Sequence, residues 1–134
     1  DILESDGMTF YRYNFIRGTN LNRMSQRKIT NNQQKIAGQL ARFIYIMHNS
    51  NVPEINDLKT DDGDGWNHHD ICNNMLIDKK NMNIVGIIDW EYAGWGPLST
   101  EIKNCTAFSR KMRQTQIDSI IWAEYKKLKS KGHQ

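Results

Sequence analysis

The spacing of apolar positions changes several times along the chain, and each spacing predicts a kind of element. Residues 8–16 alternate between polar and apolar types and are rich in β-forming side chains, which predicts a strand. The seven residues before it are too few for even one hairpin, so we expect the fold to open on this strand.

A long amphipathic helix is predicted over residues 30–48. Thr30 and Gln33 form a capping-box pattern at its start, and His48 ends it. Its apolar residues recur at helical spacing and form one face: Ile36, Leu40, Phe43, Ile44 and Met47. The pattern is typical of a helix that contributes this face to a core.

Two short apolar runs, at 75–78 and 84–88, predict a β-hairpin joined by the polar residues 79–83. The interval 49–65 before it is polar and rich in turn-forming residues, which predicts a loop.

Residues 97–132 predict two C-terminal helices. Pro97 suits a first helical turn, and the second helix runs from about Thr115 to Gly132. The apolar positions of the first are Leu98, Ile102, Cys105, Phe108 and Met112, and those of the second are Ile117, Ile120, Ile121, Tyr125 and Leu128. The sequence therefore predicts one α+β domain that is mainly helical.

Length and composition agree with a single domain. The chain has 134 residues, of which 38% are hydrophobic, and a domain of this size buries roughly two-thirds of its unfolded surface. The net charge of +3 is mild, and the lysines at 126–131 are typical of a solvated helix face rather than of a contact with nucleic acid or a membrane. No apolar run approaches membrane-spanning length, and two cysteines make no disulfide framework, so we expect a cytoplasmic protein.

The segment 66–96 carries the candidate chemistry. Asp70 lies in an H-x-D turn, Asn74 follows it, and Asp89 comes after the second strand of the predicted hairpin. In metal-dependent phosphoryl transfer, one carboxylate orients the attacking hydroxyl while an amide and a second carboxylate hold Mg²⁺ against the phosphates. We therefore expect Asp70, Asn74 and Asp89 to meet at one end of the hairpin, with both carboxylates in one cleft.

These residues resemble the aminoglycoside phosphotransferase and choline kinase family, whose fold is related to the protein kinases. The family shows H-G-D-x-x-x-x-N and then I-D-W-E-x-A-G, and residues 88–94 read Ile-Asp-Trp-Glu-Tyr-Ala-Gly. The resemblance implies that Asp70 is the catalytic residue and that Asp89 and an Asn bind Mg²⁺. It also implies that ATP is the phosphoryl donor and a small-molecule hydroxyl the acceptor.

The same resemblance suggests roles for further residues. His68 would brace the catalytic turn, and Glu91 would either contact an acceptor cation or occupy a plain surface position. The strand at 8–16 resembles the hinge of the family, where the backbone of Asn14, Phe15 and Ile16 would receive the adenine.

The chain departs from the family between Asp70 and the metal-binding Asn. The family usually has four residues there, whereas three separate Asp70 from Asn74. With the usual count Met75 would be the ligand, and a thioether is a poor partner for a hard cation. Either the loop is one residue tighter or the metal site is damaged.

No glycine-rich phosphate loop occurs in the chain, and nothing before Met8 supplies the strand Lys of a nucleotide-binding upper lobe. We therefore expect residues 1–134 to form a truncated, kinase-like catalytic lobe with weak or absent turnover. The alternative is a catalytically inactive relative that serves as a binding or scaffold protein.

Two other metal sites fit the sequence less well. His68, His69, Cys72 and Cys105 lack the paired spacing of a zinc site. The acidic residues of 61–65 suggest a calcium loop, but the downstream bidentate Glu is absent, so an acidic surface turn is the better interpretation.

Overall fold

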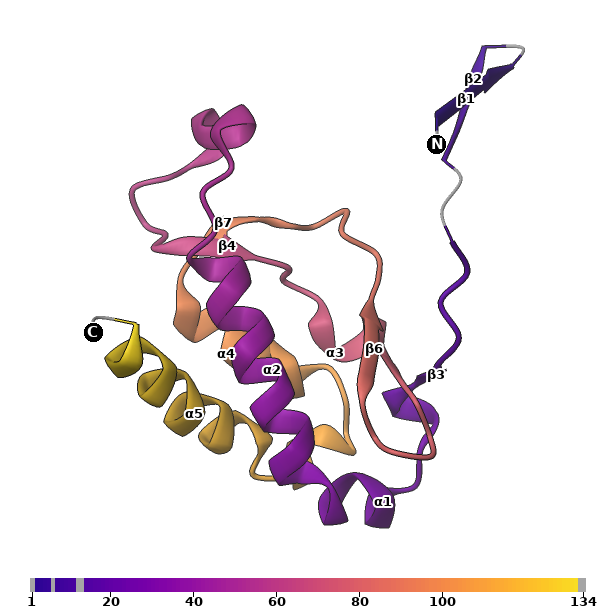
Figure 1. Cartoon of the computed structure of the whole chain (residues 1–134), viewed down its shortest axis with the longest axis vertical. Coiled ribbons are helices and arrows are strands. Elements are labelled where there is room, and N and C mark those ends of the chain that lie inside the picture. Colours follow the sequence, from indigo (N-terminus) through magenta and orange to yellow (C-terminus); the bar gives the residue numbers. More distant parts are fainter. Residues whose placement is uncertain (1, 6, 12–13, 133–134) are drawn as a thin grey trace.

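The computed structural model describes residues 2–5, 7–11 and 14–132. Its main body is built on helix α2 (Gln33–His48), which packs along helix α5 (Ile117–Lys131), with α4 (Leu98–Ala107) also against α5. Figure 1 shows α2 and α5 side by side with α4 behind them. The prediction of a mainly helical α+β fold is confirmed.

The core lies between these helices because their apolar faces follow the helical period. The buried residues that α2 and α5 contribute to the hydrophobic core cluster are Ile36, Ala37, Leu40, Ala41, Ile44, Ile117, Ile121 and Tyr125. Burying each large aliphatic side chain contributes about 1.5–3 kcal/mol, so this pair of helices supplies the main stabilising contact of the body.

The helical region begins earlier than predicted. Helix α1 (Gln26–Asn31) starts after Ser25, whose Oγ accepts a hydrogen bond from the N–H of Lys28 at 3.3 Å. Asn32 then separates α1 from α2. The predicted start at Thr30 is wrong because the competing cap, Ser25, lies one turn upstream.

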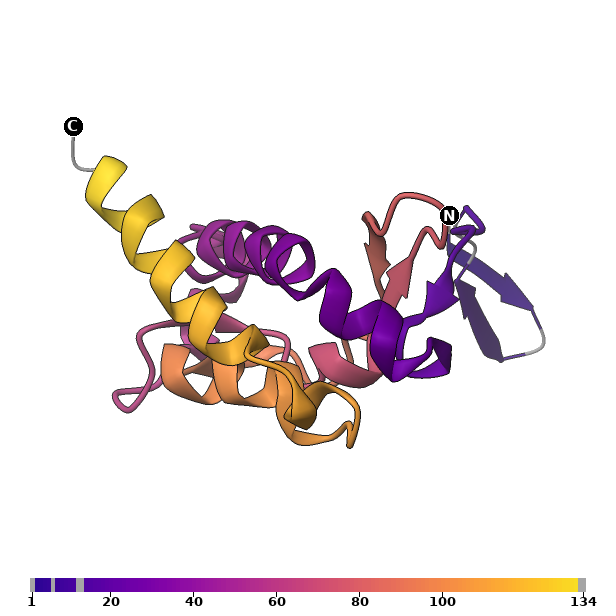
Figure 2. The same ribbon diagram turned by 90° about the horizontal axis from the view of Figure 1, so that it is seen from below.

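Two small antiparallel sheets flank the helices. Strands β3 (Thr19–Asn20), β5 (Met75–Ile77) and β6 (Ile84–Ile87) lie in the order β3-β5-β6, so the predicted hairpin is confirmed. Strand β4 (Gly65–Asn67) pairs with β7 (Gly94–Gly96). Figure 2 shows the hairpin beside α1, away from α5.

The N-terminal segment forms a hairpin of its own. Strand β1 (Ile2–Ser5) pairs antiparallel with β2 (Met8–Tyr11), and in Figure 1 this hairpin lies away from the helices. The expectation that the fold opens on the strand at 8–16 is therefore wrong, because four of the seven residues before Met8 form a strand once β2 is the partner. The predicted strand at 8–16 also ends sooner, since residues 14–16 are not in a strand and 12–13 lie outside the described residues.

Short helical turns complete the chain: η1 (Leu21–Arg23), η2 (Pro53–Leu58), α3 (Ile71–Asn74) and η3 (Met112–Gln114). Turn η2 lies within the predicted loop at 49–65. Pro97 is the N-cap of α4 rather than a residue of its first turn, and Gly132 caps α5. Within the described ranges, no helix has the length and apolar character needed to cross a membrane.

Candidate functional site

The turn at 68–70 joins strand β4 to helix α3 and presents Asp70 as the N-cap of that helix. His69 has a φ of 69°, in the left-handed region that few residues other than glycine adopt. A non-glycine residue there costs about 1 kcal/mol or more, so the surrounding structure must hold the turn in place.

Helix α4 supplies that support through Glu101 and Asn104, which lie three residues apart on one helical face. The side chain of Glu101 is fully buried, and its two oxygens accept hydrogen bonds from the N–H groups of His68 at 3.0 Å and His69 at 2.9 Å. Asn104 Nδ2 donates to the carbonyl of His69 at 3.1 Å. Because both oxygens of Glu101 act as acceptors, the ionised carboxylate is the form that fits.

His68 connects the turn to the end of strand β6. Its Nδ1 accepts the N–H of Asp70 at 3.2 Å, so Nε2 carries the proton and donates to the carbonyl of Ile88 at 2.9 Å. The buried ring also packs edge-on against Trp90, with centroids 4.7 Å apart. These contacts tie the turn at 68–70 to the end of β6, and the bracing of a catalytic turn by His68 stays a prediction.

The carboxylate of Asp70 is fixed by two neighbouring amides. Asn73 Nδ2 donates to Oδ1 at 2.8 Å, and Asn74 Nδ2 donates to Oδ2 at 3.1 Å and to the Asp70 carbonyl at 3.0 Å. Met75 is fully buried in the core. The shortened spacing therefore corresponds to a single helical turn that sets Asn74 beside Asp70 and sends the thioether inward.

Asp89 follows strand β6, next to the same turn. The N–H of Ile88 donates to the Asn74 carbonyl at 3.1 Å, which joins the backbone before Asp89 to the backbone of Asn74. Asp89 has a φ of 61° and an exposed side chain, which makes no hydrogen bond or ion pair among the described residues. Asp is one of the few residues that tolerate this backbone conformation.

An open cavity of about 480 Å³ lies at Asp70 and is lined by His69, Asp70, Asn73, Tyr92 and Phe108. Tyr92 is 64% exposed and Phe108 is 60% exposed, so two aromatic side chains offer their surfaces beside the carboxylate. Asp89 does not line this cavity. The convergence of the two carboxylates on one cleft stays a prediction.

The other residues predicted to bind ligands do not line the cavity at Asp70. Phe15 is 86% exposed and Asn14 is also exposed, while Ile16 is half-buried, and a Cβ built on Gly86 of strand β6 would lie 3.0 Å from its side chain. Glu91 is exposed and makes no hydrogen bond within the described ranges. Its position agrees with a surface residue, and a contact with an acceptor stays a prediction.

The donor atoms around Asn74 suit a hard divalent cation. The amide of Asn74 turns its Nδ2 toward Asp70, and its Oδ1 accepts no hydrogen bond from the described residues. With the exposed carboxylate of Asp89 it offers oxygen ligands, which Mg²⁺ prefers. No three His, Cys, Asp or Glu side chains in the described part of the chain gather into a metal cluster, so the amide is needed for such a site.

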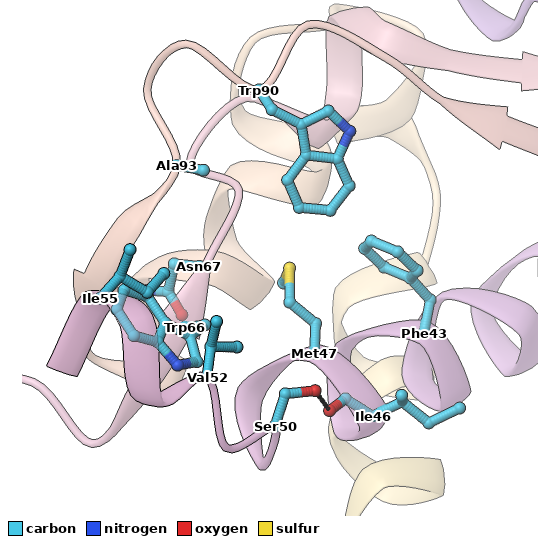
Figure 3. Close-up of a pocket in the computed structure, with 10 residues that line it drawn as sticks. All are labelled: Phe43, Ile46, Met47, Ser50, Val52, Ile55, Trp66, Asn67, Trp90 and Ala93. Atoms are coloured by element: carbon cyan, nitrogen blue, oxygen red, sulfur yellow. Dashed lines mark hydrogen bonds between the residues drawn. The ribbon is translucent and has the colours of Figure 1, made fainter. Parts of the chain in front are cut away.

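A second cavity, of about 400 Å³, is lined in part by residues of the loop after β6 (Figure 3). Trp90 and Ala93 line it, whereas Tyr92 lines the cavity at Asp70. Its remaining walls are largely apolar and come from the end of α2, residues 50–55 and strand β4. Residues of the loop at 90–93 therefore contribute to both cavities, and Asp70 lines only the first of them.

The model of the phosphotransferase enzyme family matches residues 22–129. The chain belongs to this family. No curated protein and no solved structure gives a significant match. The match includes the turn at 68–70, Asn74, Asp89 and helix α4, whereas residues 14–16 lie before it.

Glu101 and Asn104 are site residues of this phosphotransferase-family chain that the sequence patterns did not reveal. The available signal was the position of Glu101 beside Leu98, Ile102 and Cys105, on the apolar face of a predicted helix. A carboxylate on a buried face needs partners, because an unpaired buried charge is strongly destabilising. The partners are backbone N–H groups, which leave no mark in a sequence.

The thiol beside the site is poorly suited to act as a nucleophile. Burial raises the pKa of Cys72 to about 11, and the charge of Asp70 acts in the same direction. Because the thiolate is the reactive form, Cys72 is expected to remain an inert core residue at neutral pH.

Proposed function

We propose that this chain forms the catalytic lobe of a phosphotransferase that moves the γ-phosphoryl group of ATP to a hydroxyl of a small molecule. The observation that carries the proposal is the placement of Asp70. Its carboxylate stands at a cavity of about 480 Å³, on a turn that Glu101 and His68 hold through backbone atoms. Membership of the phosphotransferase enzyme family supports this chemistry.

Asp70 would receive the acceptor hydroxyl as a hydrogen-bond donor. As the hydroxyl oxygen forms its bond to the γ-phosphorus, the bond from that phosphorus to the β,γ-bridging oxygen breaks, and the proton passes to an Asp70 oxygen. The amides of Asn73 and Asn74 hold the carboxylate still, so less freedom is lost in reaching this geometry.

Asn74 and Asp89 are the proposed metal-binding residues, through Oδ1 of the amide and the free carboxylate. Bound Mg²⁺ would neutralise charge on the phosphate oxygens of ATP. The hard oxygen donors and the unengaged Oδ1 support this assignment.

The acceptor is proposed to lie in the cavity at Asp70, where Tyr92 and Phe108 would cover its apolar surface. The backbone at 14–16 is proposed to meet the adenine, as the family resemblance implies. We place the reaction in the cytoplasm, where free buried thiols such as Cys72 and Cys105 remain reduced.

Thermal shift with MgATP tests the nucleotide site. A ligand at about 100 times its dissociation constant adds roughly 2.7 kcal/mol of stability. We expect the dissociation constant of MgATP to be no better than roughly millimolar. The melting temperature should therefore rise only at high nucleotide concentration. Asp89→Ala should abolish the shift, whereas the matched control Asp57→Ala, which changes an exposed carboxylate on η2, should keep it.

Phosphoryl transfer to a panel of small-molecule alcohols, followed by ADP release, tests the catalytic step. Asp70→Asn should bind MgATP like the parent protein and lose transfer. Binding without transfer in the parent would favour a catalytically inactive binding protein, and a shift that survives Asp89→Ala would place the nucleotide elsewhere.

A further inference from the structure

The two amides that hold Asp70 differ in how they are themselves held. Asn74 bonds to both the carbonyl and Oδ2 of Asp70 within one helical turn, so local geometry sets its orientation. Asn73 is exposed and reaches Asp70 only through its side chain. Its amide can donate to Asp70 in only one of its two orientations, because rotation by 180° would present the carbonyl oxygen.

Asn22, about fifty residues earlier in the chain, selects that orientation. Its Nδ2 donates to Oδ1 of Asn73 at 3.2 Å and lies 3.5 Å from the carbonyl of Cys72. The side chain of Asn20 also donates to the backbone carbonyl of Asn73. With its oxygen engaged by Asn22, Asn73 must turn its Nδ2 toward the carboxylate of Asp70.

The backbone of Asn22 is held at both its N–H and its carbonyl. Its N–H donates to Oδ1 of Asn20 at 2.9 Å, and the ammonium group of Lys111 donates to its carbonyl at 2.9 Å and to that of Met24 at 2.6 Å. The backbone of η1 is therefore anchored to the segment after α4, and the direction of the Asn22 side chain follows from this anchoring.

The unused oxygen of Asn22 shows which orientation the fold retains. Oδ1 of Asn22 is buried and accepts no hydrogen bond from the described residues. An unpaired buried oxygen destabilises a fold, and such an atom in a native structure calls for an explanation. Rotating the Asn22 amide would turn this oxygen toward Oδ1 of Asn73 and the carbonyl of Cys72, which are also acceptors. The orientation that points Nδ2 at Asn73 is therefore the one retained.

We propose that Asn22 and Asn73 are positioning residues for Asp70, acting as a relay of oriented amides. Asn22 orients Asn73, and Asn73 holds Oδ1 of Asp70, which sets the rotamer of the carboxylate. The inference rests on the proposed function, in which Asp70 receives the acceptor hydroxyl.

Asn22→Asp is the sharpest test, because it keeps the shape of the side chain and replaces the donor with an acceptor. The Asn73 amide should then rotate toward the new carboxylate and present its oxygen to Asp70. We expect kcat to fall by about tenfold with KM unchanged, since one hydrogen bond becomes a repulsive contact. Asn22→Ala, which only removes the donor, should have a smaller effect.

A double-mutant cycle separates the relay from a general effect of charge or stability. In Asn73→Ala the relay is already broken, so adding Asn22→Asp should cause no further loss of kcat. Asn83→Asp, an equal change of charge on an exposed turn, is the matched control and should leave kcat unchanged. Additive losses in the cycle would overturn the proposal.

A readout independent of activity uses NMR three-bond couplings, which report the χ1 rotamer of Asp70. The parent protein and Asn83→Asp should show one rotamer, whereas Asn73→Ala and Asn22→Asp should show averaging. Unchanged couplings in both of these variants, and in Asn22→Ala should Asn22→Asp not fold, would overturn the relay. If Asp70→Asn retains transfer activity, the proposed function fails instead, and the couplings still decide the relay.

Discussion

Replacing Glu101 with Gln should destabilise the whole protein, because the side chain that holds the turn at 68–70 is fully buried. Each backbone N–H that it binds donates to a charged oxygen, and such a bond contributes about 1.5–3 kcal/mol. Gln keeps one acceptor but sets its NH₂ group against the other N–H, so one bond is lost and one donor is left unpaired. We expect a loss of about 3 kcal/mol.

Urea unfolding followed by circular dichroism measures this loss, which corresponds to a melting temperature lower by roughly 10 °C. Hydrogen exchange at the amides of His68 and His69 should accelerate in the same variant. The control is Glu124→Gln, which breaks a surface pair with Lys127 at 2.7 Å and should change the free energy of unfolding by less than about 0.5 kcal/mol. A loss below about 1 kcal/mol for Glu101→Gln, with protection of both amides retained, would refute the reasoning.

Four further changes test other parts of the structure. Asp89→Asn should change the free energy of unfolding by less than about 1 kcal/mol, because Asn also tolerates a positive φ; a loss above about 3 kcal/mol in urea would mark Asp89 as structural. His69→Gly should be neutral or stabilising by up to about 1 kcal/mol, since glycine adopts φ 69° without strain; a lower melting temperature would contradict this. Gly65→Ala should cost several kcal/mol, because a Cβ there would lie 2.3 Å from the ring of His48, and an unchanged urea midpoint would contradict the packing. The raised pKa of Cys72, about 11, predicts a contribution to stability that is present below pH 9 and lost as the pH rises toward 11, because the unfolded thiol ionises first; Cys72→Ala should remove this part of the pH dependence measured by urea unfolding.

The elements with a strong hydrophobic period were predictable. The apolar face of α2 was identified because it follows the helical spacing over many residues, and the β5–β6 hairpin because two short apolar runs flank a polar connection. Helix boundaries were less predictable, since Thr30 and Ser25 offer similar caps and only the chain path decides between them. The N-terminal hairpin was missed because β1 is stabilised by pairing with β2 rather than by a pattern of its own.

The candidate site was predictable where chemistry demands a residue type. Asp70 and Asn74 were predicted from their motif, and the structure joins them by a hydrogen bond, while their catalytic and metal-binding roles stay predictions. The relay through Asn22 and the support from Glu101 could not be predicted, because both depend on contacts between segments far apart in sequence. Glu101 binds backbone N–H groups, which place few demands on residue type, and Asn22 meets the side chain of a residue about fifty positions away, so neither contact has a recognisable spacing.

The way the turn at 68–70 is held has a consequence for how such a site can change over evolution. The turn is held by hydrogen bonds between its backbone N–H and C=O groups and the side chains of Glu101, Asn104 and His68. Every residue except proline provides both of these backbone groups. These hydrogen bonds therefore place no demand on the side chain at position 69, where the positive φ is the remaining constraint, and His69 stands at the position of Gly in the H-G-D motif that the chain resembles. A turn held this way can change the side chain that it presents to the cavity beside Asp70 while the backbone of the turn keeps its shape.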